Sequence, residues 1–139
     1  MSLREEIEAF FAAYVDAFAR WDIHAICVLW APTAAFVMPT ANVAMDAAAF
    51  RDNGVKLLDF YRRQQVAWPE GKLLSRDELF PGVAEARMAY RLFDAAGAEI
   101  VAWKHVYMLR KTDRWRAVLA VADGEIAAWA ERGTPLGSA

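Results

Sequence analysis

The sequence predicts one α+β domain in which helices come first and a curled antiparallel sheet follows. Apolar residues recur at steps of three and four in the first half of the chain and alternate with polar residues in the second half. Turn signals divide the second half into segments that can pair with their neighbours. The chain has 139 residues, 58% of them hydrophobic, which suits a single core spanning residues 1–139.

A long first helix is expected at the N-terminus. Ser2 followed by Glu5 has the spacing of a capping box. The apolar stripe behind it consists of Leu3, Ile7, Phe10, Tyr14, Phe18 and Trp21. These features predict an amphipathic helix that buries one face.

Two shorter helices and a strand follow. Asp22 is the expected cap of a short helix that includes Trp30 and ends at Pro32. Residues 34–39 (AAFVMP) indicate a short buried strand, followed by a loop. Asp46 is the expected cap of a third helix, which Pro69 and Gly71 close.

Four strands are predicted in the second half, at residues 72–80, 83–93, 99–111 and 114–123. In VAWKHVYMLRK, residues 101–111, alternation puts His105 on one apolar face with Trp103, Tyr107 and Leu109. Residues 124–133 (GEIAAWAERG) add a last helical turn.

Charge and composition exclude several classes of function. The 16 basic and 18 acidic residues give a net charge of -2 without a basic run, so neither nucleic acid nor an anionic membrane is an expected partner. The uncharged residues 25–45 contain Pro32 and Pro39, which argue against a membrane span. No signal peptide is recognisable. A lone Cys27 and the lack of CxxC or paired histidines predict no disulfide, no metal and no cofactor, and fit the cytoplasm.

Residues 13–39, AYVDAFARWDIHAICVLWAPTAAFVMP, and the order of elements resemble the nuclear transport factor 2-like superfamily, in particular its ketosteroid isomerase branch. The resemblance implies a cone: a curved antiparallel sheet wrapped around the long N-terminal helix and two shorter helices, with an apolar pocket inside. It also implies a homodimer formed through the convex face of the sheet. Activity does not follow from it, because this fold carries many functions.

The resemblance assigns roles to three positions. Tyr14 matches the tyrosine that donates a hydrogen bond to the substrate oxyanion, and His105 falls where the family has an acidic second donor. Met38 occupies the position of the general base, and a thioether cannot remove a proton. Ketosteroid isomerisation by the family's own route is therefore not expected. Tyr14 and His105 can instead act as hydrogen-bond partners for each other, or as structural core residues.

The SnoaL-like polyketide cyclases are a second branch that the sequence resembles, and they use a cavity histidine and aspartate as acid and base. His105 fits the first role. On the last strand the family alignment turns Val118, Ala120 and Ala122 inward, whereas burial alone favours Trp115, Leu119 and Val121. Neither set contains a carboxylate, so Asp94 and Asp123 at strand ends are secondary candidates.

Three functions remain open. The first is a small soluble domain whose pocket binds a small hydrophobic or aromatic molecule. The expected pocket residues are Tyr14, Met38, Met88, Tyr90, Leu92, Trp103, His105 and Val118. The second is an isomerase or lyase in which His105, kept neutral by burial, acts as acid or base and Tyr14 as oxyanion donor. The third is a non-catalytic, dimerising accessory domain.

Overall fold

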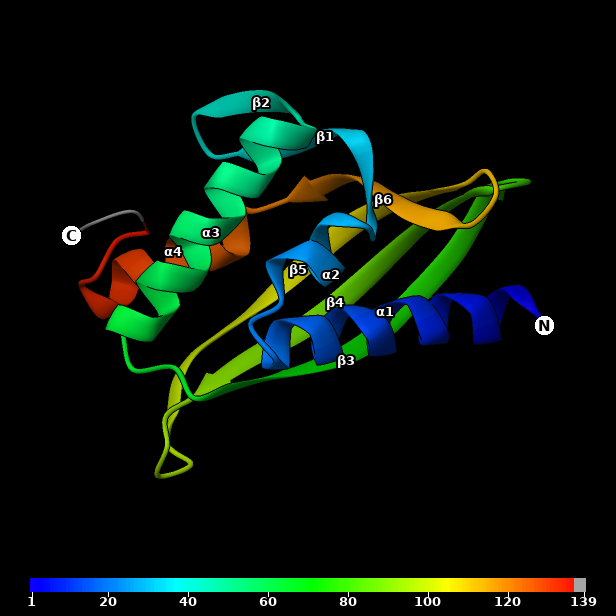
Figure 1. Ribbon diagram of the computed structural model, residues 1–139. Helices are drawn as coiled ribbons and strands as arrows, with labels where there is room; N and C mark the ends of the chain where they lie inside the picture. Colours follow the sequence, from blue (N-terminus) through cyan, green and yellow to red (C-terminus); the bar gives the residue numbers. More distant parts are fainter. Residues whose placement is uncertain (137–139) are drawn as a thin grey trace.

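The computed structural model describes residues 1–136, which form four helices and one six-stranded sheet (Figure 1). In chain order the elements are α1 (Leu3–Ala19), α2 (Ile23–Cys27), β1 (Trp30–Met38), β2 (Ala41–Asp46), α3 (Ala47–Arg63), β3 (Trp68–Phe80), β4 (Val83–Phe93), β5 (Glu99–Lys111), β6 (Trp115–Val121) and α4 (Asp123–Arg132). The predicted α+β class is confirmed.

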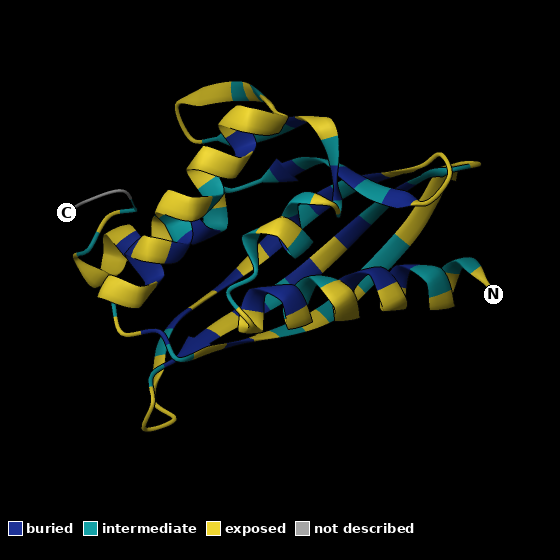
Figure 2. Ribbon diagram, in the orientation of Figure 1, coloured by how far each residue is buried: buried dark blue, intermediate teal, exposed yellow. Residues whose placement is uncertain are grey.

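The sheet is curved and has the strand order β2-β1-β6-β5-β4-β3. Helix α1 runs along one face of the long strands, and α3 and α4 lie together at the other end of the molecule (Figure 1). Buried residues line this inner face and the helix surfaces turned towards it, whereas exposed residues follow the outer sides (Figure 2). The core therefore lies between the helices and the concave face of the sheet.

The expectation of a wholly antiparallel sheet is wrong at one pair. Strand β6 lies antiparallel to β5 but parallel to β1. The β5–β6 hairpin places the last strand beside the first one. These two strands are far apart in the sequence, so only the assembled fold determines their pairing. The loop expected after residue 39 is also corrected, because Ala41–Asp46 pairs with β1 as a hairpin with Pro39 and Thr40 in the turn.

All three predicted helix caps are confirmed. The side chains of Ser2, Asp22 and Asp46 accept the backbone N–H of the residue three positions on, at 3.2, 3.0 and 2.8 Å. Each bond satisfies one of the N–H groups that a helix N-terminus leaves free.

Two helices end earlier than predicted, because the prolines expected to end them lie in the strands that follow. Helix α2 ends at Cys27, and Trp30 already belongs to β1. Pro32 lies in β1 where the pairing with β6 is irregular, between Trp30 and Ala35. Helix α3 ends at Arg63, and Pro69 lies in the edge strand β3. Edge strands and bulges accept a residue without an N–H, so these prolines mark strands and not helix ends.

The inward face of β5 is as predicted, with Trp103, His105, Tyr107 and Leu109 all buried. On β6 neither predicted alternation holds along the whole strand. Tyr107 pairs with Ala120 and Leu109 with Ala117, so a bulge falls between these alanines, at Val118. One extra residue reverses the inward side of a strand, so Trp115 and Ala117 point inward before the bulge and Ala120 after it. Val118 itself is only half-buried.

Residues 123–132 form a full helix, α4, longer than the single turn expected. It packs on β5 where Gly124 meets the backbone of Lys104, and a Cβ at position 124 would lie 2.5 Å from that carbonyl oxygen. Glycine thus permits the close approach that brings the next residue, Glu125, to the inner face of β5. Among residues 1–136, no helix combines the length and apolarity that crossing a bilayer requires.

Candidate functional site

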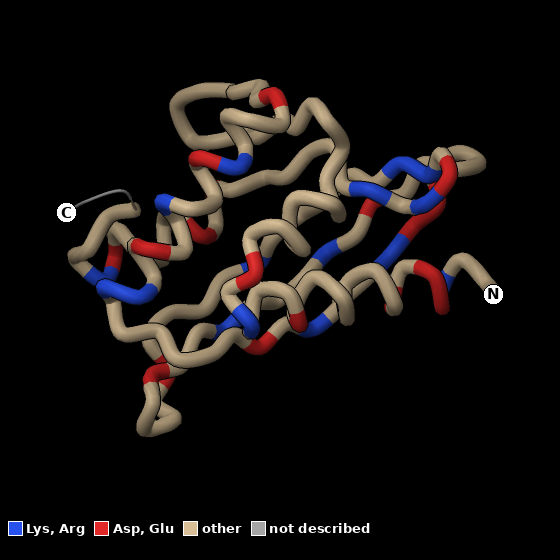
Figure 3. Tube along the Cα trace, in the orientation of Figure 1, with Lys and Arg blue, Asp and Glu red and all other residues tan. Residues whose placement is uncertain are grey.

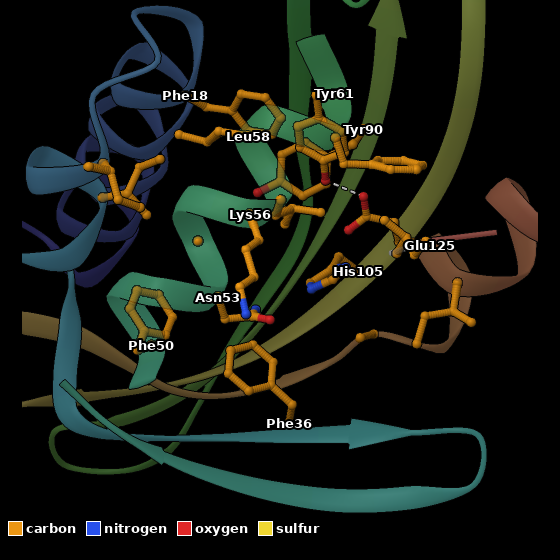
Figure 4. A pocket seen from close by; sticks show the side chains of 18 of the residues that line it. Phe18, Phe36, Phe50, Asn53, Lys56, Leu58, Tyr61, Tyr90, His105 and Glu125 are labelled. Carbon is orange, nitrogen blue, oxygen red and sulfur yellow. Dashed lines mark hydrogen bonds between the residues drawn. The ribbon is translucent and has the colours of Figure 1, made fainter. Parts of the chain in front are cut away.

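A cavity of about 700 Å³ lies between the concave face of the sheet and the helices, within the size range of small-molecule sites. Its walls are mainly aromatic and aliphatic and include Phe18, Ile26, Trp30, Phe36, Phe50 and Leu58. Asn53 and Lys56 reach the same space from α3 (Figure 4). The fold therefore creates an apolar chamber with a few polar groups in its wall.

Five of the residues expected from the sequence line this cavity: Tyr14, Met38, Tyr90, Trp103 and His105. Among the described residues, Met88 and Leu92 are core residues away from the cavity, and Val118 lies at the β6 bulge.

The two secondary aspartates lie apart from the cavity wall. Asp94 stands in the β4–β5 turn, where it accepts the N–H groups of Ala96 and Ala98 at 2.9 Å. Asp123 is exposed in the first turn of α4.

His105 has one ring nitrogen engaged and one turned to the cavity. The Trp103 indole Nε1–H donates to Nδ1 at 3.1 Å, so the neutral imidazole carries its proton on Nε2. No acceptor in residues 1–136 bonds to Nε2. Burial disfavours the charged imidazolium and lowers the pKa of His105 from 6.5 to about 4, so the ring is neutral near pH 7. The geometry makes it a hydrogen-bond donor.

Tyr14 and His105 line the same cavity, but each has a tryptophan as its partner, which corrects the expected mutual bond. Trp30 Nε1–H donates to the Tyr14 hydroxyl at 3.1 Å. Burial raises the pKa of Tyr14 to about 12. Alongside them the hydroxyls of Tyr90 and Tyr107 share a hydrogen bond of 2.8 Å.

Glu125, the most unusual group of the site, was not expected from the sequence, and it is only 6% exposed. Its Oε2 accepts two hydrogen bonds, one from the Tyr61 hydroxyl and one from Trp129 Nε1 at 3.2 Å. Burial raises the pKa of its carboxyl from 4.5 to about 7. One signal was present in the sequence: Glu125 precedes the apolar Trp129 by four positions and so shares its helix face.

The second oxygen of Glu125, Oε1, is turned away from Tyr61 towards the cavity (Figure 4). No donor within residues 1–136 bonds to Oε1, and no arginine or lysine of these residues forms an ion pair with Glu125. Figure 3 shows that basic and acidic residues are interspersed along the chain, without a block of one sign near α4. Across residues 1–136, His, Cys, Asp and Glu side chains nowhere gather in threes that could hold a metal ion.

A cone-shaped sheet that wraps around helices and encloses an aromatic pocket is the arrangement of nuclear transport factor 2-like proteins. The sequence model described as NTF2-like protein (DUF6841) matches residues 4–125, so the chain belongs to this family. No curated protein matches the sequence.

Three solved structures share the fold at low sequence identity. A ketosteroid isomerase-like protein from Erwinia carotovora atroseptica SCRI1043 has a TM-score of 0.65 at 18% identity, over 84% of this chain and 92% of that one. An NTF-2 like protein of unknown function from Shewanella oneidensis MR-1 has a TM-score of 0.68 at 10% identity, over 86% and 98%. A putative calcium/calmodulin dependent protein kinase II association domain from Xanthomonas campestris has 0.64 at 17%, over 87% and 86%. These likenesses establish the fold alone.

Proposed function

We propose that this protein binds a small, largely apolar molecule inside the cone. One observation carries the proposal. The cavity of about 700 Å³ has an aromatic wall in which two polar atoms, Nε2 of His105 and Oε1 of Glu125, have no partner among residues 1–136.

Hydrogen-bond energetics support this assignment. Within residues 1–136 the fully buried side-chain polar atoms without a partner are Trp115 Nε1 and Thr134 Oγ1, so Nε2 of His105 and Oε1 of Glu125 can meet water in the cavity. A ligand that buries its apolar surface on the aromatic wall displaces this water. It must then supply an acceptor for His105 and a donor for Glu125, because a buried polar atom left without a partner costs about 1–3 kcal/mol. The ring of His105 is held at the wall by its neighbours, with its centroid 4.9 Å from that of Tyr107.

Catalysis is the second candidate function, because Tyr14 and His105 line one cavity. In an isomerase or lyase, a donor at the position of the substrate oxygen stabilises the negative charge that develops there. The proton on Nε2 suits His105 to that donor role. Base catalysis by His105 would first require its proton to move to Nδ1, which already accepts the Trp103 N–H.

Protein-observed NMR with a library of small aromatic and alicyclic compounds tests the binding proposal. We expect hits to shift the amide signals of the β5 and α4 residues around the cavity. Tyr14→Phe and His105→Ala should each weaken binding about tenfold or more while the spectrum stays folded.

A filled cavity provides the matched control. Ala122→Phe places a ring into the cavity wall and should abolish binding, whereas Ala102→Phe adds the same ring on the exposed outer face of β5 and should not. Equal affinity in wild type and Ala122→Phe would show that the hits bind elsewhere and would leave the accessory-domain alternative.

A further inference from the structure

Glu125 is a buried ionisable group for which residues 1–136 supply no counterion. Both of its hydrogen bonds within residues 1–136 end on Oε2, and both donors are neutral: the Tyr61 hydroxyl and the Trp129 indole. These two bonds hold the carboxyl group in place. They leave Oε1, which faces the cavity, as the atom that either keeps a proton or meets a ligand.

We infer that the ligand of this pocket carries a protonated amine, whose ammonium group donates to Oε1 of Glu125 while its apolar body packs on the aromatic wall. This inference rests on the proposed binding function and specifies the chemical class of the ligand.

The residues around Oε1 of Glu125 favour a bound cation. A carboxylate in an apolar site is strongly favoured by a partner of opposite charge, because burial otherwise forces it to bind a proton. The rings of Tyr90 and Trp103 line the same cavity, and aromatic rings attract cations. The ammonium therefore replaces the proton that the buried carboxyl binds in the empty pocket.

His105 defines a second requirement. Its Nε2–H needs an acceptor, and a second cationic centre beside this donor would be unfavourable. A ligand with one ammonium group and one hydroxyl or carbonyl oxygen on an apolar body matches both unpartnered atoms. A ligand carboxylate, in contrast, would meet the charge of Glu125.

The tyrosines of the cavity and His105 stay neutral through the physiological range. Burial raises the pKa of Tyr61 on α3, Tyr90 on β4 and Tyr107 on β5 well above 10, and that of Tyr14 on α1 to about 12. The pKa of His105 on β5 is lowered to about 4. On α3, Lys56, Asp59 and Arg63 also line the cavity, and Asp59 and Arg63 pair with each other at 3.1 Å. On α4, Arg132 bonds to the Ile100 carbonyl oxygen.

Amine binding should therefore follow the ionisation of Glu125. Because the ammonium selects the carboxylate, affinity should rise with pH up to about 7 and then level off. Each pH unit below that point should weaken binding by about tenfold, since one proton must leave for each amine that binds.

Calorimetry with three matched indoles tests the inference: tryptamine (amine), tryptophol (alcohol) and indole-3-acetate (carboxylate). We expect tryptamine to bind wild-type protein about tenfold or more tightly than the other two. Its affinity should rise with pH up to about 7 and then level off. Glu125→Gln keeps the shape and should remove this preference. Lys56→Gln, which removes a cation from the cavity lining, should leave the preference in place or increase it.

The outcomes separate the two proposals. Tryptophol binding as tightly as tryptamine, or pH-independent tryptamine binding to wild type, overturns the amine inference and leaves the pocket proposal standing. The wild-type pH series stays decisive if Glu125→Gln fails to fold. Failure of all three indoles and of the wider compound library to bind overturns the binding proposal itself.

Discussion

Tyr61 of α3 donates its phenolic hydrogen to Glu125 of α4, which lies 64 positions further along the chain. The Tyr61 ring also stacks on Phe18 of α1, with centroids 5.3 Å apart, and on Trp129 of α4 at 6.0 Å. One buried hydrogen bond and two ring contacts thus connect three helices at the wall of the cavity. The stability of the fold and the properties of the site should be coupled through Glu125.

The stability of the native state should depend on pH through Glu125 and His105 in opposite directions. The native pKa of Glu125 is about 7 against 4.5 for the free group, so its contribution to the free energy of unfolding falls as pH rises across that interval. The native pKa of His105 is about 4 against 6.5, so its contribution rises with pH between those values. The two slopes oppose each other between pH 4.5 and 6.5.

Single variants should separate these slopes. Relative to wild type, Glu125→Gln should gain about 3 kcal/mol in unfolding free energy as pH rises from 4.5 to 7, and His105→Gln should lose about 3 kcal/mol between 4 and 6.5. Urea unfolding at several pH values measures both differences. If the unfolding free energy of a variant changed with pH in the same way as that of wild type, the substituted residue would not have the shifted native pKa given above.

Removal of the Tyr61 hydroxyl should destabilise the protein and change the titration of Glu125. Tyr61→Phe should cost about 1–3 kcal/mol, because it removes a hydrogen bond to a charged group. That bond lowers the pKa of Glu125, so the pKa should rise further in the variant. Tyr90→Phe, which loses only the neutral bond to Tyr107, is the matched control. Carbon-13 NMR titration of the Glu125 carboxyl provides the readout, and an unchanged pKa would argue against the bond.

Alanine at position 124 should destabilise the protein although it favours helix formation. Helix propensity alone predicts that Gly124→Ala stabilises α4 by up to about 1 kcal/mol. The added Cβ meets the Lys104 carbonyl oxygen at 2.5 Å, and overpacking of this kind costs about 1–3 kcal/mol. Thermal unfolding gives the sign, with Ala127→Gly on the exposed face of α4 as the reference for propensity. A net gain in stability would show that α4 does not pack this closely on β5.

The tautomer of His105 should depend on Trp103. In wild type the indole N–H occupies Nδ1, so imidazole nitrogen-15 shifts should report the proton on Nε2. Trp103→Phe removes the donor and should produce a mixture of the two tautomers. His24, which is exposed, supplies the second imidazole signal as an internal control. If wild type instead showed the proton on Nδ1, His105 could not be the hydrogen-bond donor proposed for the cavity.

Homodimerisation through the convex face stays a prediction from the family resemblance. Val106 and Met108 are half-buried on the outward face of β5, between the exposed Lys104 and Arg110. We expect sedimentation to give twice the chain mass of 15.6 kDa, and Val106→Glu to shift the protein towards the monomer. Lys104→Gln on the same strand is the control. A wild-type monomer at high concentration would rule the dimer out.

Local signals in the sequence determined where the helices begin and which sides of β4 and β5 face inward. The three helix caps depend on residues three positions apart, and the buried face of β5 follows from strict alternation. For the same reason His105, Trp103 and Tyr90 were identifiable as pocket residues before the fold was known.

Tertiary structure decided the features that join distant segments. The parallel β1–β6 pair, the bulge at Val118 and the approach of α4 to Lys104 arise where elements meet, and no periodicity within one element encodes them. The same holds for the partners of the polar groups: Trp30 for Tyr14, and Tyr61 for Glu125. A carboxyl group becomes unusual only when burial removes its water, and burial is a property of the assembled fold.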